Sequence, residues 1–570
     1  MSHVPGTTRY FDDPERPQYA ADGVEGLKCD TSGPVPIILV PQPSDDPNDP
    51  LNWPIWKRDL ITFILSMVAI FATCLGPILA ANTLTLAMWY TTNFTAIAEL
   101  TGWYLLGVGL GAFLFVPSGR IWGKRHLFVL GTVLLVITSA WGGGSLHSYR
   151  SFVAARVWQG IATAPFESLV NAAVGDLYYV HERGIRMAFT NLAVFGGAFF
   201  TPILVGKITN SIGWWWTFYL VAIFCGVCLP FVYFFCPEMA YRRDTSLNLD
   251  MLDRENPATA STSAQGHVEK PAPQAEGASA VPTAEHASTK HSNDSSGDAS
   301  TQAMSPAPGT PKAKASFKES LALFNGRKTD ESFWKLLLRP LPLFLQPAFL
   351  WACLIQGMMI GWTVFIGVIL AQFFLGAPLW WGEEYTGYAY TSAFIGAILG
   401  FVIAGVLSDW SARLMTKWNN GVYEPEFRIV LVIPQMIIGC AGLYGWGITV
   451  DGLLIRKYHY AVPLTFFALE VAGMVIGAVA SSLYIVDAYR DLAIEGFTCM
   501  IIFKNIFSFA LTLKAFDWLI TTGTHATPLF NILASLQVGV CLLSIPMYIY
   551  GKRLRSFFHR NDILAFFKVR

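Results

Sequence analysis

The strongest constraint in this sequence is a series of twelve stretches, each about twenty residues long, that contain mostly apolar side chains. They lie near residues 60–82, 99–118, 127–146, 152–175, 187–208, 214–236, 347–371, 386–407, 429–449, 462–486, 497–520 and 529–549. A stretch of about this length crosses the hydrocarbon core of a bilayer as one helix. Only 14% of the 570 residues are charged, whereas a soluble protein carries about 25%. The sequence therefore predicts an all-α membrane protein with twelve transmembrane helices and excludes a large soluble enzyme.

The twelve stretches form two groups of six, separated by a long polar segment. Between residues 255 and 314 this segment is mostly Ala, Ser, Thr, Pro and Gln, so it cannot bury enough apolar surface to fold. From Phe317 to Arg339 aromatic and Leu residues return among charges, which predicts a short amphipathic helix against the membrane. We expect a disordered cytosolic tail (1–58), a six-helix bundle (59–236), a cytosolic and largely disordered linker with an amphipathic end (237–345), a second six-helix bundle (346–549) and a cytosolic tail (550–570).

The distribution of basic residues predicts the orientation of the chain in the membrane. With the amino terminus inside, eighteen Lys and Arg residues flank the cytosolic ends of the stretches, and only four lie in the outer loops. Cytosolic loops carry the excess of Lys and Arg, so both termini are expected in the cytosol. The sequon Asn93-Phe94-Thr95 then faces outside, where it is a glycosylation site, whereas the sequon at Asn293 falls in the cytosolic linker and should stay unmodified.

Composition and missing motifs exclude several other functions. Lys and Arg together number 39, as do Asp and Glu, and phosphate binding needs a basic excess, so no nucleic-acid partner is expected. The sequence has no GxxxxGK[ST] loop for ATP and no HExxH or GxSxG motif, which argues against an enzyme and against a cofactor. Cys225 and Cys228 have CxxC spacing inside an apolar helix and the histidines are scattered, so no metal centre is expected.

The two halves of the chain echo each other. Asp176-Leu-Tyr178 ends the fourth stretch, and Asp487-Ala-Tyr489 ends the tenth. Ser118 precedes the loop after the second stretch, and Ser408 takes the same place after the eighth. Weak similarity between two six-helix halves is typical of secondary transporters, which bind their substrate between the halves. Chance likeness among apolar helices is the alternative reading.

Several motifs resemble those of the major facilitator superfamily, and more narrowly its fungal twelve-span drug:proton antiporters and their polyamine- and cation-transporting relatives. The motifs are Asp49-Pro-Leu-Asn-Trp-Pro54, Gly119-Arg-Ile-Trp-Gly-Lys-Arg125, Arg156-Val-Trp-Gln-Gly160, Asp176-Leu-Tyr-Tyr-Val-His-Glu-Arg-Gly184, Gly213-Trp-Trp-Trp-Thr-Phe218, Tyr423-Glu-Pro-Glu426 and Tyr484-Ile-Val-Asp-Ala-Tyr489. The resemblance covers nearly all of residues 46–555 except the linker. It implies a major facilitator fold of two six-helix pseudo-repeats, a small-molecule substrate, protons as coupling ions, and a monomer in the plasma membrane.

A basic loop follows the second stretch and predicts a cytosolic gate. Its candidates are Arg120, Gly123, Lys124 and Arg125, and the corresponding residues of the other half are Asp409 and Arg413. Arg and Lys at the end of a helix bridge to carboxylates and to the carboxyl termini of neighbouring helices. The resemblance implies an acidic residue before the arginine, but this chain has Gly119, which weakens the latch in this half. Ordinary positive-inside anchoring is the alternative.

The fourth stretch contains four polar side chains, Arg156, Gln159, Glu167 and Asn171. At about 100° per residue, Arg156 and Glu167 lie only some 20° apart around a helix, and the other two lie within about 60°. Ionisable groups inside a membrane are costly and usually functional, so this face is expected to look into a cavity or a partner and not into lipid, with Glu167 as the proton-coupling carboxylate. Arg156 is about 16 Å away along the axis, too far for a direct pair. A structural carboxylate bonded to a neighbouring helix is the alternative.

The second half offers Glu470 and Lys504 near mid-depth, with Asn505 beside them. At about 1.5 Å rise per residue their depths differ by a few ångströms, so a buried pair is expected. A purely structural ion pair is the alternative. Further candidates for the cavity wall, or else for packing, are Gln356, Trp362, Tyr388 and Tyr390.

The fifth stretch contains Gly197, Pro202 and Gly206, which resemble the helix-kink motif of antiporters. Glycines let helices approach closely, and a proline kinks a helix. The resemblance implies a glycine before the proline, and Thr201 stands there instead, which leaves the direction of transport open.

Three functional hypotheses follow from these features. The first is a proton-coupled carrier that exports drugs or secondary metabolites by alternating access between its two halves. The second is proton-driven uptake of small organic cations such as polyamines, because midplane carboxylates suit cations. The third is a membrane nutrient sensor that does not transport, although such sensors usually add a long cytosolic tail and only about 20 residues follow the last stretch.

Overall fold

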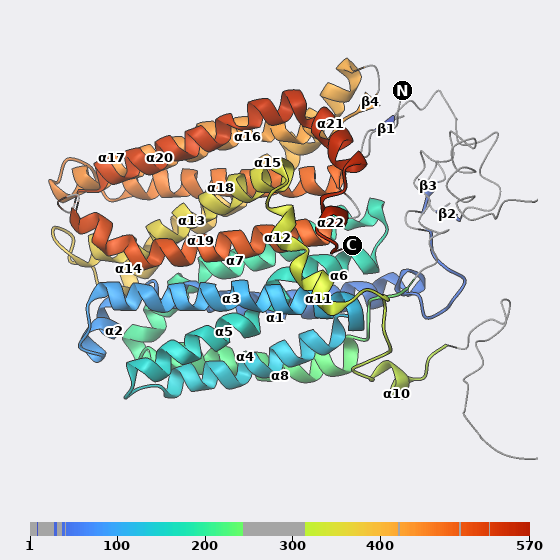
Figure 1. Cartoon of the computed structure of the whole chain (residues 1–570). Coiled ribbons are helices and arrows are strands. Elements are labelled where there is room, and N and C mark those ends of the chain that lie inside the picture. Colours follow the sequence, from blue (N-terminus) through green and yellow to red (C-terminus); the bar gives the residue numbers. More distant parts are fainter. Residues whose placement is uncertain are drawn as a thin grey trace, which may run out of the picture.

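The computed structural model is a bundle of long helices that run roughly side by side, with β1 (Thr8–Arg9) and α22 (Ile563–Phe566) near the same end of the bundle (Figure 1). It describes residues 8–9, 28–30, 37–39, 42–242, 314–419, 422–489, 492–521, 523 and 525–569. The linker region 243–313 and most of the first 41 residues lie outside the described residues, so their expected disorder stays a prediction.

The first half contains the six predicted spans as long helices joined by short elements. The elements are η1 (Pro50–Asn52), α1 (Ile55–Cys74), η2 (Pro77–Leu79), α2 (Thr83–Trp89), α3 (Phe94–Trp122), α4 (Arg125–Gly144), α5 (Tyr149–Ser168), α6 (Val170–Leu177), α7 (Val180–Ile212) and α8 (Trp215–Phe235). The fourth span is divided between α5 and α6, which meet at Leu169. This position is four residues after Pro165, which lacks a backbone N–H donor inside α5.

The second half repeats this arrangement after three short helices. These are α10 (Phe317–Ser320), α11 (Phe333–Leu338) and α12 (Pro340–Leu343). The remaining helices are α13 (Pro347–Leu375), α14 (Glu383–Ala389), α15 (Thr391–Trp418), η4 (Pro425–Leu431), α16 (Val432–Pro434), η5 (Gln435–Gly439), α17 (Cys440–Leu454), α18 (Ala461–Ala488), α19 (Ala493–Thr521), α20 (Ala526–Leu542), α21 (Ser544–Arg560) and α22 (Ile563–Phe566). Strands occur only as short pairs among the described residues: β1 (Thr8–Arg9) with β4 (Val422–Tyr423), and β2 (Cys29–Asp30) with β3 (Ile37–Ile38), both antiparallel.

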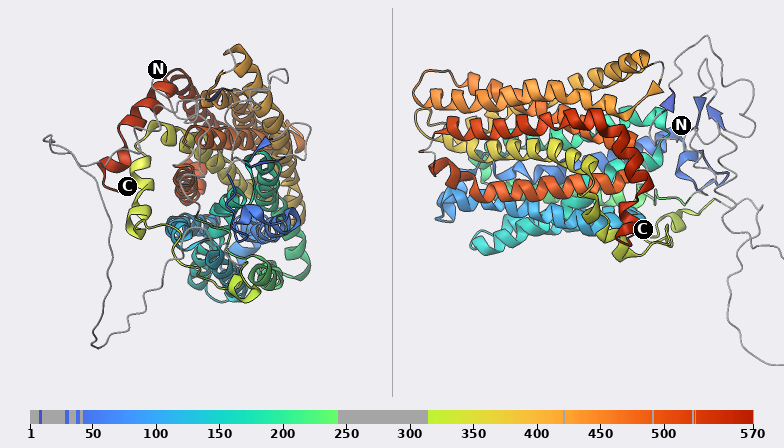
Figure 2. Two further views of the ribbon diagram at one scale, coloured as in Figure 1. Left: turned by 90° about the vertical axis from the view of Figure 1, so that its right-hand side faces the viewer. Right: turned by 45° about the horizontal axis from the view of Figure 1, so that its top comes forward.

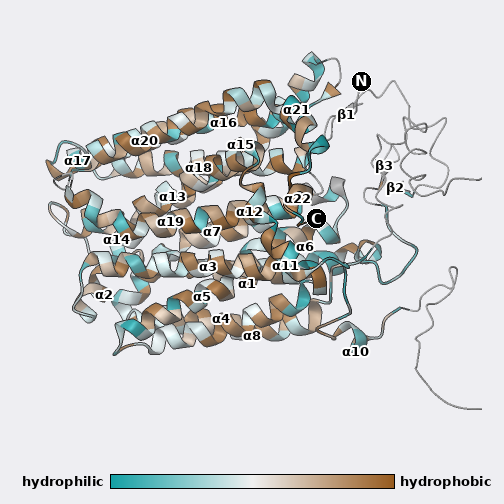
Figure 3. Cartoon of the chain, in the orientation of Figure 1, coloured by the Kyte–Doolittle hydropathy of each residue, from teal (hydrophilic) through white to brown (hydrophobic). Residues whose placement is uncertain are grey.

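Ten helical segments of the described chain are long and apolar enough to cross a membrane. The other two predicted spans are α1 and the α5–α6 pair, which are more polar. Lys57, Arg58 and Asp59 stand at the start of α1, and Arg156 and Glu167 lie within α5. Hydrophobic residues run along the long helices, and many of their outward side chains are exposed, as in a protein that faces lipid (Figure 3). The all-α membrane architecture with two six-helix halves is confirmed.

The helices of each half lie together, and the two halves pack side by side (Figure 2, left). Helices α3 and α19 make the longest contact between the halves, and α7 packs against α14 and α15. Aromatic pairs lie along these contacts, with ring centroids 6.0 Å apart for Phe94 and Phe516 and 5.8 Å apart for Phe195 and Phe401. The interface is therefore formed by pairs of helices that could rock against each other.

The internal repeat has a structural counterpart at the end of the bundle near β1 and α22. We call this end of the bundle the basic end, because Arg58, Arg120, Lys124, Arg125 and Arg428 lie there. Asp176 accepts from Lys124 at 2.6 Å, and Asp487 accepts from Arg428 at 3.0 Å. Each aspartate ends the fourth helical span of its half and binds the loop after the second span, so the sequence echo marks equivalent positions.

The ordered end of the linker differs from the single amphipathic helix that we expected. Two short helices, α10 and α11, are separated by residues 321–332, which include Gly326 in the left-handed region at φ +76°. Ser316 and Glu319 form a capping box on α10, and Lys328 donates its backbone N–H to Ile121 at 2.7 Å. The segment follows the surface of the basic end and does not lie along it as one helix.

Candidate transport site

A cavity of about 190 Å³ lies between the two halves of the bundle. Residues of the first half that line it include Tyr104 on α3, Glu167 on α5 and Phe199 on α7. Those of the second half include Thr363 on α13, Tyr390 before α15 and Lys504 on α19. Most of the wall is apolar, so the few polar groups that converge on it define where a substrate or a proton can be held.

An ion pair between Lys504 and Glu167 crosses from one half to the other at this cavity. Both side chains are largely buried, with 11% and 14% of their surfaces exposed. Lys504 was expected to pair with Glu470, and this is wrong. Helix α19 packs mainly against α3 of the opposite half and α13 of its own, so Lys504 faces the first half and not α18. Depth along the bundle could be counted from the sequence, but the direction of the side chain could not.

Glu470 lies on α18 and is completely buried. Its Oε1 accepts from the hydroxyl of Thr363 at 2.8 Å, and its Oε2 has no hydrogen-bond partner. Asn505 lines the cavity beside Lys504, and its amide donates to the carbonyl of Ile501 at 3.0 Å in its own helix.

The polar face expected on the fourth span does not look into the cavity as a whole. Of its four residues only Glu167 lines the cavity. Arg156 donates to the carbonyls of Leu75 at 2.7 Å and Leu100 at 3.2 Å, and its guanidinium lies 4.7 Å from the ring of Tyr104. It therefore caps the carboxyl end of α1, where free carbonyls and the helix dipole favour a cation.

The other two members of this face also bind neighbouring helices. Gln159 accepts from Arg156 at 2.9 Å and donates to the carbonyl of Thr138 at 3.0 Å. Asn171 lies on α6 beyond the break in the fourth span, and its amide donates to Asn191 on α7 at 3.0 Å. These side chains face neighbouring helices, one of the two surroundings expected for this face. They do not line the cavity, because backbone carbonyls and α7 satisfy them.

The aromatic candidates divide in the same way. Tyr390 lines the cavity, and its hydroxyl donates to the carbonyl of Gly367 at 2.5 Å. Trp362 instead donates to Gln537 at 3.1 Å inside the second half. Tyr388 donates to Glu384 at 2.8 Å near the opposite end of the bundle, and Gln356 accepts from a serine of α18. Tyr104, Phe199 and Thr363 line the cavity and had no distinguishing signal in the sequence.

The basic loop after α3 holds its own half together. Lys124 binds Asp176, and Arg125 is buried, donating to the carbonyls of Tyr233 at 2.7 Å and Cys236 at 2.8 Å. Gly123 adopts φ +94°, and a Cβ there would collide with the carboxylate of Glu238. Glycine is needed at this position both for its backbone conformation and for that close approach.

Arg120 instead reaches across to the second half. It forms an ion pair with Glu495 at the start of α19, and Glu495 also pairs with Arg339 at 3.4 Å. Arg339 is held in turn by Glu331 of the linker at 2.6 Å, and Glu331 lies 3.7 Å from Arg120. This basic-end network joins both halves and the linker, and Glu495 supplies the acidic group that Gly119 cannot.

In the second half, the two residues expected to form the gate do not pair with each other, although Asp409 reaches Arg428. Asp409 is exposed and lies 4.0 Å from Arg428, and Arg413 is exposed, with no ion pair in the described part of the chain. Arg428 takes their place: it donates to Asp487 at 3.0 Å and to the hydroxyl of Ser408 at 2.6 Å. The expected residues are on α15, whereas the equivalent of the basic loop is η4.

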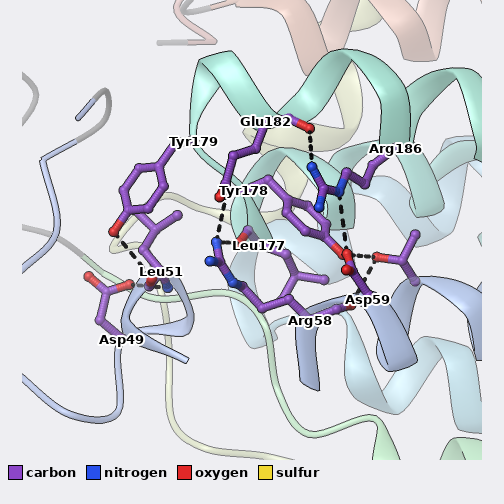
Figure 4. Close-up of polar contacts among 10 residues, drawn as sticks. Asp49, Leu51, Arg58, Asp59, Leu177, Tyr178, Tyr179, Glu182 and Arg186 are labelled. Carbon is purple, nitrogen blue, oxygen red and sulfur yellow. Dashed lines mark hydrogen bonds and ion pairs between the residues drawn. The ribbon is translucent and has the colours of Figure 1, made fainter. Parts of the chain in front are cut away.

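A second polar cluster ties the start of α1 to the junction of α6 and α7 (Figure 4). Arg58 donates to Glu182 at 2.9 Å and to the carbonyl of Leu177 at 3.0 Å. Asp59 accepts from the hydroxyl of Tyr178 at 2.8 Å and from Arg186 at 3.3 Å (Figure 4). Two of the sequence motifs meet here, because the hydroxyl of Tyr179 donates to the carbonyl of Leu51 at 3.2 Å, and all of these contacts stay within the first half.

The opposite end of the bundle, which we call the far end, also joins the halves. Lys207 pairs with Glu384 at 2.8 Å, and the backbone N–H of Thr85 donates to Glu383 at 3.0 Å. Gly206 lies so close to α14 that a Cβ there would be 2.6 Å from the carbonyl of Glu383.

The helix-kink motif belongs to this contact region. Helix α7 continues through Pro202, and Gly197 lies against α1, where a Cβ would be 3.1 Å from the carbonyl of Ile70. The motif therefore permits close packing of α7 on α1 and on α14. Asn93 is exposed at the far end and caps α3, accepting from the N–H of Ala96 at 3.0 Å.

Two six-helix halves that enclose a mid-bundle cavity, with ion pairs joining them at either end, are the arrangement that is typical of secondary transporters. The chain belongs to the Major Facilitator Superfamily, whose family model matches residues 61–493. It is accordingly a membrane transporter of small molecules and not an enzyme.

Similar proteins include Protein HOL1 of Saccharomyces cerevisiae, which is 24% identical, with 97% of this chain and 95% of that protein covered. Efflux pump radE of Floropilus chiversii is 22% identical, over 90% of this chain and 84% of that protein. Among solved structures, the proton:xylose symporter XylE matches with a TM-score of 0.55 and 13% identity, covering 87% of this chain and 96% of that chain. The likeness to XylE concerns the fold alone.

Proposed function

We propose that this chain is a proton-coupled transporter that exports small organic molecules, with Glu167 as the proton-carrying carboxylate. The observation that carries the proposal is the ion pair of Glu167 with Lys504, because it lies at the cavity and joins the two halves. A proton on Glu167 would cancel one charge of this pair. The halves would then be released from each other at the level where the substrate sits.

Substrate and proton can be coupled at this pair by competition. An ionised Glu167 holds Lys504 across the cavity, and a protonated Glu167 leaves the ammonium free to bind a substrate group or to turn away. Breaking a buried pair by neutralising one partner costs about 3–5 kcal/mol unless the other charge finds a new partner. A substrate that supplies that partner is therefore favoured only in one protonation state, which is the requirement for coupled transport.

Export is favoured by relatives such as efflux pump radE, whose alignment spans most of both chains. Uptake of small organic cations remains a second candidate, because two carboxylates, Glu167 and Glu470, and one ammonium, Lys504, lie at or next to the cavity among the described residues. The two directions make opposite predictions. An exporter accumulates substrate in vesicles with an acidic lumen, and a symporter accumulates it in vesicles with an alkaline lumen.

The test uses purified protein in liposomes with an imposed pH gradient and four labelled probes: ethidium, rhodamine 6G, tetraphenylphosphonium and spermidine. We expect the wild-type protein to accumulate at least one probe, and Glu167→Gln to abolish accumulation while keeping exchange at equal concentrations. Glu319→Gln, an exposed carboxylate of α10, is the matched control and should behave as wild type. Full pH-driven accumulation by well-folded Glu167→Gln protein would overturn the assignment.

A further inference from the structure

One completely buried carboxylate of the described membrane helices has no ion-pair partner. Glu470 is completely buried, its Oε2 has no hydrogen-bond partner, and no ion pair with a basic side chain forms in the described part of the structure. An isolated ionised carboxylate in a low-dielectric interior is strongly disfavoured, and such a group takes up a proton instead. Taking up a proton would remove this cost at Glu470.

The groups on the elements packed around Glu470 give it no compensating charge. Helix α17 packs against Glu470 at Gly442, where a Cβ would be 2.7 Å from the Cα of Glu470. The nearby titratable group of that helix is Cys440. Tyr390, before α15, packs its ring against Phe467 of α18, and its hydroxyl donates to the carbonyl of Gly367. Lys504 on α19 is engaged with Glu167.

The internal repeat shows that this position does not need a carboxylate for packing. Glu470 lies seventeen residues before Asp487, and Gln159 lies seventeen residues before Asp176. A Cβ at Gly142 would contact the amide of Gln159, just as one at Gly442 would contact Glu470. The first half thus holds a neutral amide in the equivalent place and satisfies it with Arg156 and a backbone carbonyl.

The equivalent of Arg156 in the second half is Phe467, twenty residues before the repeated aspartate. The second half therefore has a carboxylate where the first half has the amide of Gln159, and it has a phenylalanine where the first half has the cation of Arg156. A buried acid without a counter-charge has one physical property that an amide lacks, namely that it can change its charge by one proton.

Thr363 connects Glu470 to the cavity. Its side chain lines the cavity, and its Oγ1 lies 2.8 Å from Oε1 of Glu470 and 3.1 Å from the carbonyl oxygen of Met359. A hydroxyl has one hydrogen to donate and can also accept. With Glu470 protonated, Thr363 accepts from the acid and donates to Met359, and with Glu470 ionised it donates to the carboxylate.

We propose that Glu470 is a second proton-carrying residue of the transport cycle, reached from the cavity through the hydroxyl of Thr363. The inference rests on the proposed proton-coupled function at Glu167. In the step, the O–H bond of Glu470 breaks as its proton passes to Oγ1 of Thr363, and the hydrogen that this hydroxyl carried before passes to water that has entered the cavity. Thr363 keeps the proton from Glu470 and donates it in a hydrogen bond to the carboxylate that remains. The reverse step reloads the proton from the other side of the membrane.

The first test measures how many protons move with each substrate molecule. At zero membrane potential, each coupled proton allows about a tenfold substrate gradient per pH unit. We expect wild-type protein in liposomes to support a gradient of about a hundredfold per pH unit, and Glu470→Gln about tenfold. Glu167→Gln should support none, because substrate binding is tied to protonation only through the competition of Glu167 with substrate for Lys504. The probe is whichever of ethidium, rhodamine 6G, tetraphenylphosphonium or spermidine the wild type accumulates. An unchanged gradient in Glu470→Gln overturns this inference and leaves Glu167 untouched, whereas no accumulation by the wild type overturns the proposed function itself.

A second measurement does not depend on transport by the variant. Infrared difference spectra of the detergent-purified protein between acidic and alkaline pH report protonated carboxyl groups directly. We expect a carboxyl band in the wild type that is lost in Glu470→Gln, and a wild-type spectrum in that variant would contradict the proposal. Thr363→Val keeps the shape of the side chain without its hydroxyl. It should reach the wild-type gradient more slowly, and an unchanged rate would exclude the relay.

Discussion

A single substitution at Glu495 should raise the fraction of molecules that are open at the basic end. Its carboxylate is 6% exposed and pairs with Arg120 of the first half and with Arg339, which belongs to the linker side of the second half. Glu495→Gln keeps the size of the side chain and removes its charge. The basic end then loses the contact that joins the halves directly, while the far-end pairs are unaffected.

The structure bounds the size of this effect. Arg339 keeps Glu331 at 2.6 Å, and Arg120 is 31% exposed, so water can solvate it once its partner is neutral. The loss should therefore fall below the roughly 3–5 kcal/mol of a fully buried broken pair and above the 1 kcal/mol or less of an exposed pair, at about 1.5–3 kcal/mol. Since about 1.4 kcal/mol corresponds to a factor of ten, the population open at the basic end should rise about 10- to 100-fold.

The assay is a spin–spin distance measurement between labels at Trp56 on α1 and Lys417 on α15, both exposed at the basic end. The longer-distance population should grow in Glu495→Gln. Asp330→Asn is the matched control, because Asp330 and its partner Arg242 are 77% and 60% exposed, and its loss should leave the distribution unchanged. An unchanged distribution in well-folded Glu495→Gln would refute the view that this network holds the basic end closed.

Three further predictions concern other parts of the chain. Lys207→Gln should lower the longer-distance population at the basic end, by less than about fivefold, because the pair of Lys207 with Glu384 at the far end is partly exposed. A change as large as that of Glu495→Gln would contradict this. Arg156→Met should lower the free energy of unfolding by about 3 kcal/mol or more, because it leaves the carbonyls at the end of α1 uncapped. The measurement is a lower melting temperature in detergent, and Arg413→Gln, at an exposed site, should leave that temperature unchanged. Asn93→Gln should abolish the gel-mobility shift caused by glycosidase treatment of protein from a eukaryotic host, and a shift that persists would contradict the proposed orientation.

The architecture could be predicted because it depends on properties that are local in sequence. Length and apolarity identify a membrane span, and the repeated Asp176 and Asp487 mark equivalent positions, which the structure places in equivalent contacts with Lys124 and Arg428. A loop residue such as Gly123 could also be singled out, because its motif is continuous in the chain. The break of the fourth span into α5 and α6 was missed, although Pro165 marks the region.

The pairing of charges could not be predicted, because it depends on which helices face each other. Glu167 and Lys504 are 337 residues apart and meet only because α19 packs against the opposite half. Helical periodicity placed Arg156 and Glu167 on one face but could not show that carbonyls of another helix would satisfy the first of them. Glu495 was missed for the same reason: its role appears only when Arg120 reaches it across the interface.

The central claim is that protons and substrate move together through the site at Glu167. The most direct test loads unbuffered liposomes with a pH dye and imposes a gradient of an accumulated probe without any pH gradient. We expect the wild-type protein to convert the substrate gradient into a change of lumenal pH, and Glu167→Gln to move probe by exchange with no pH change. Transport of the probe by the wild-type protein without any movement of protons would contradict the account.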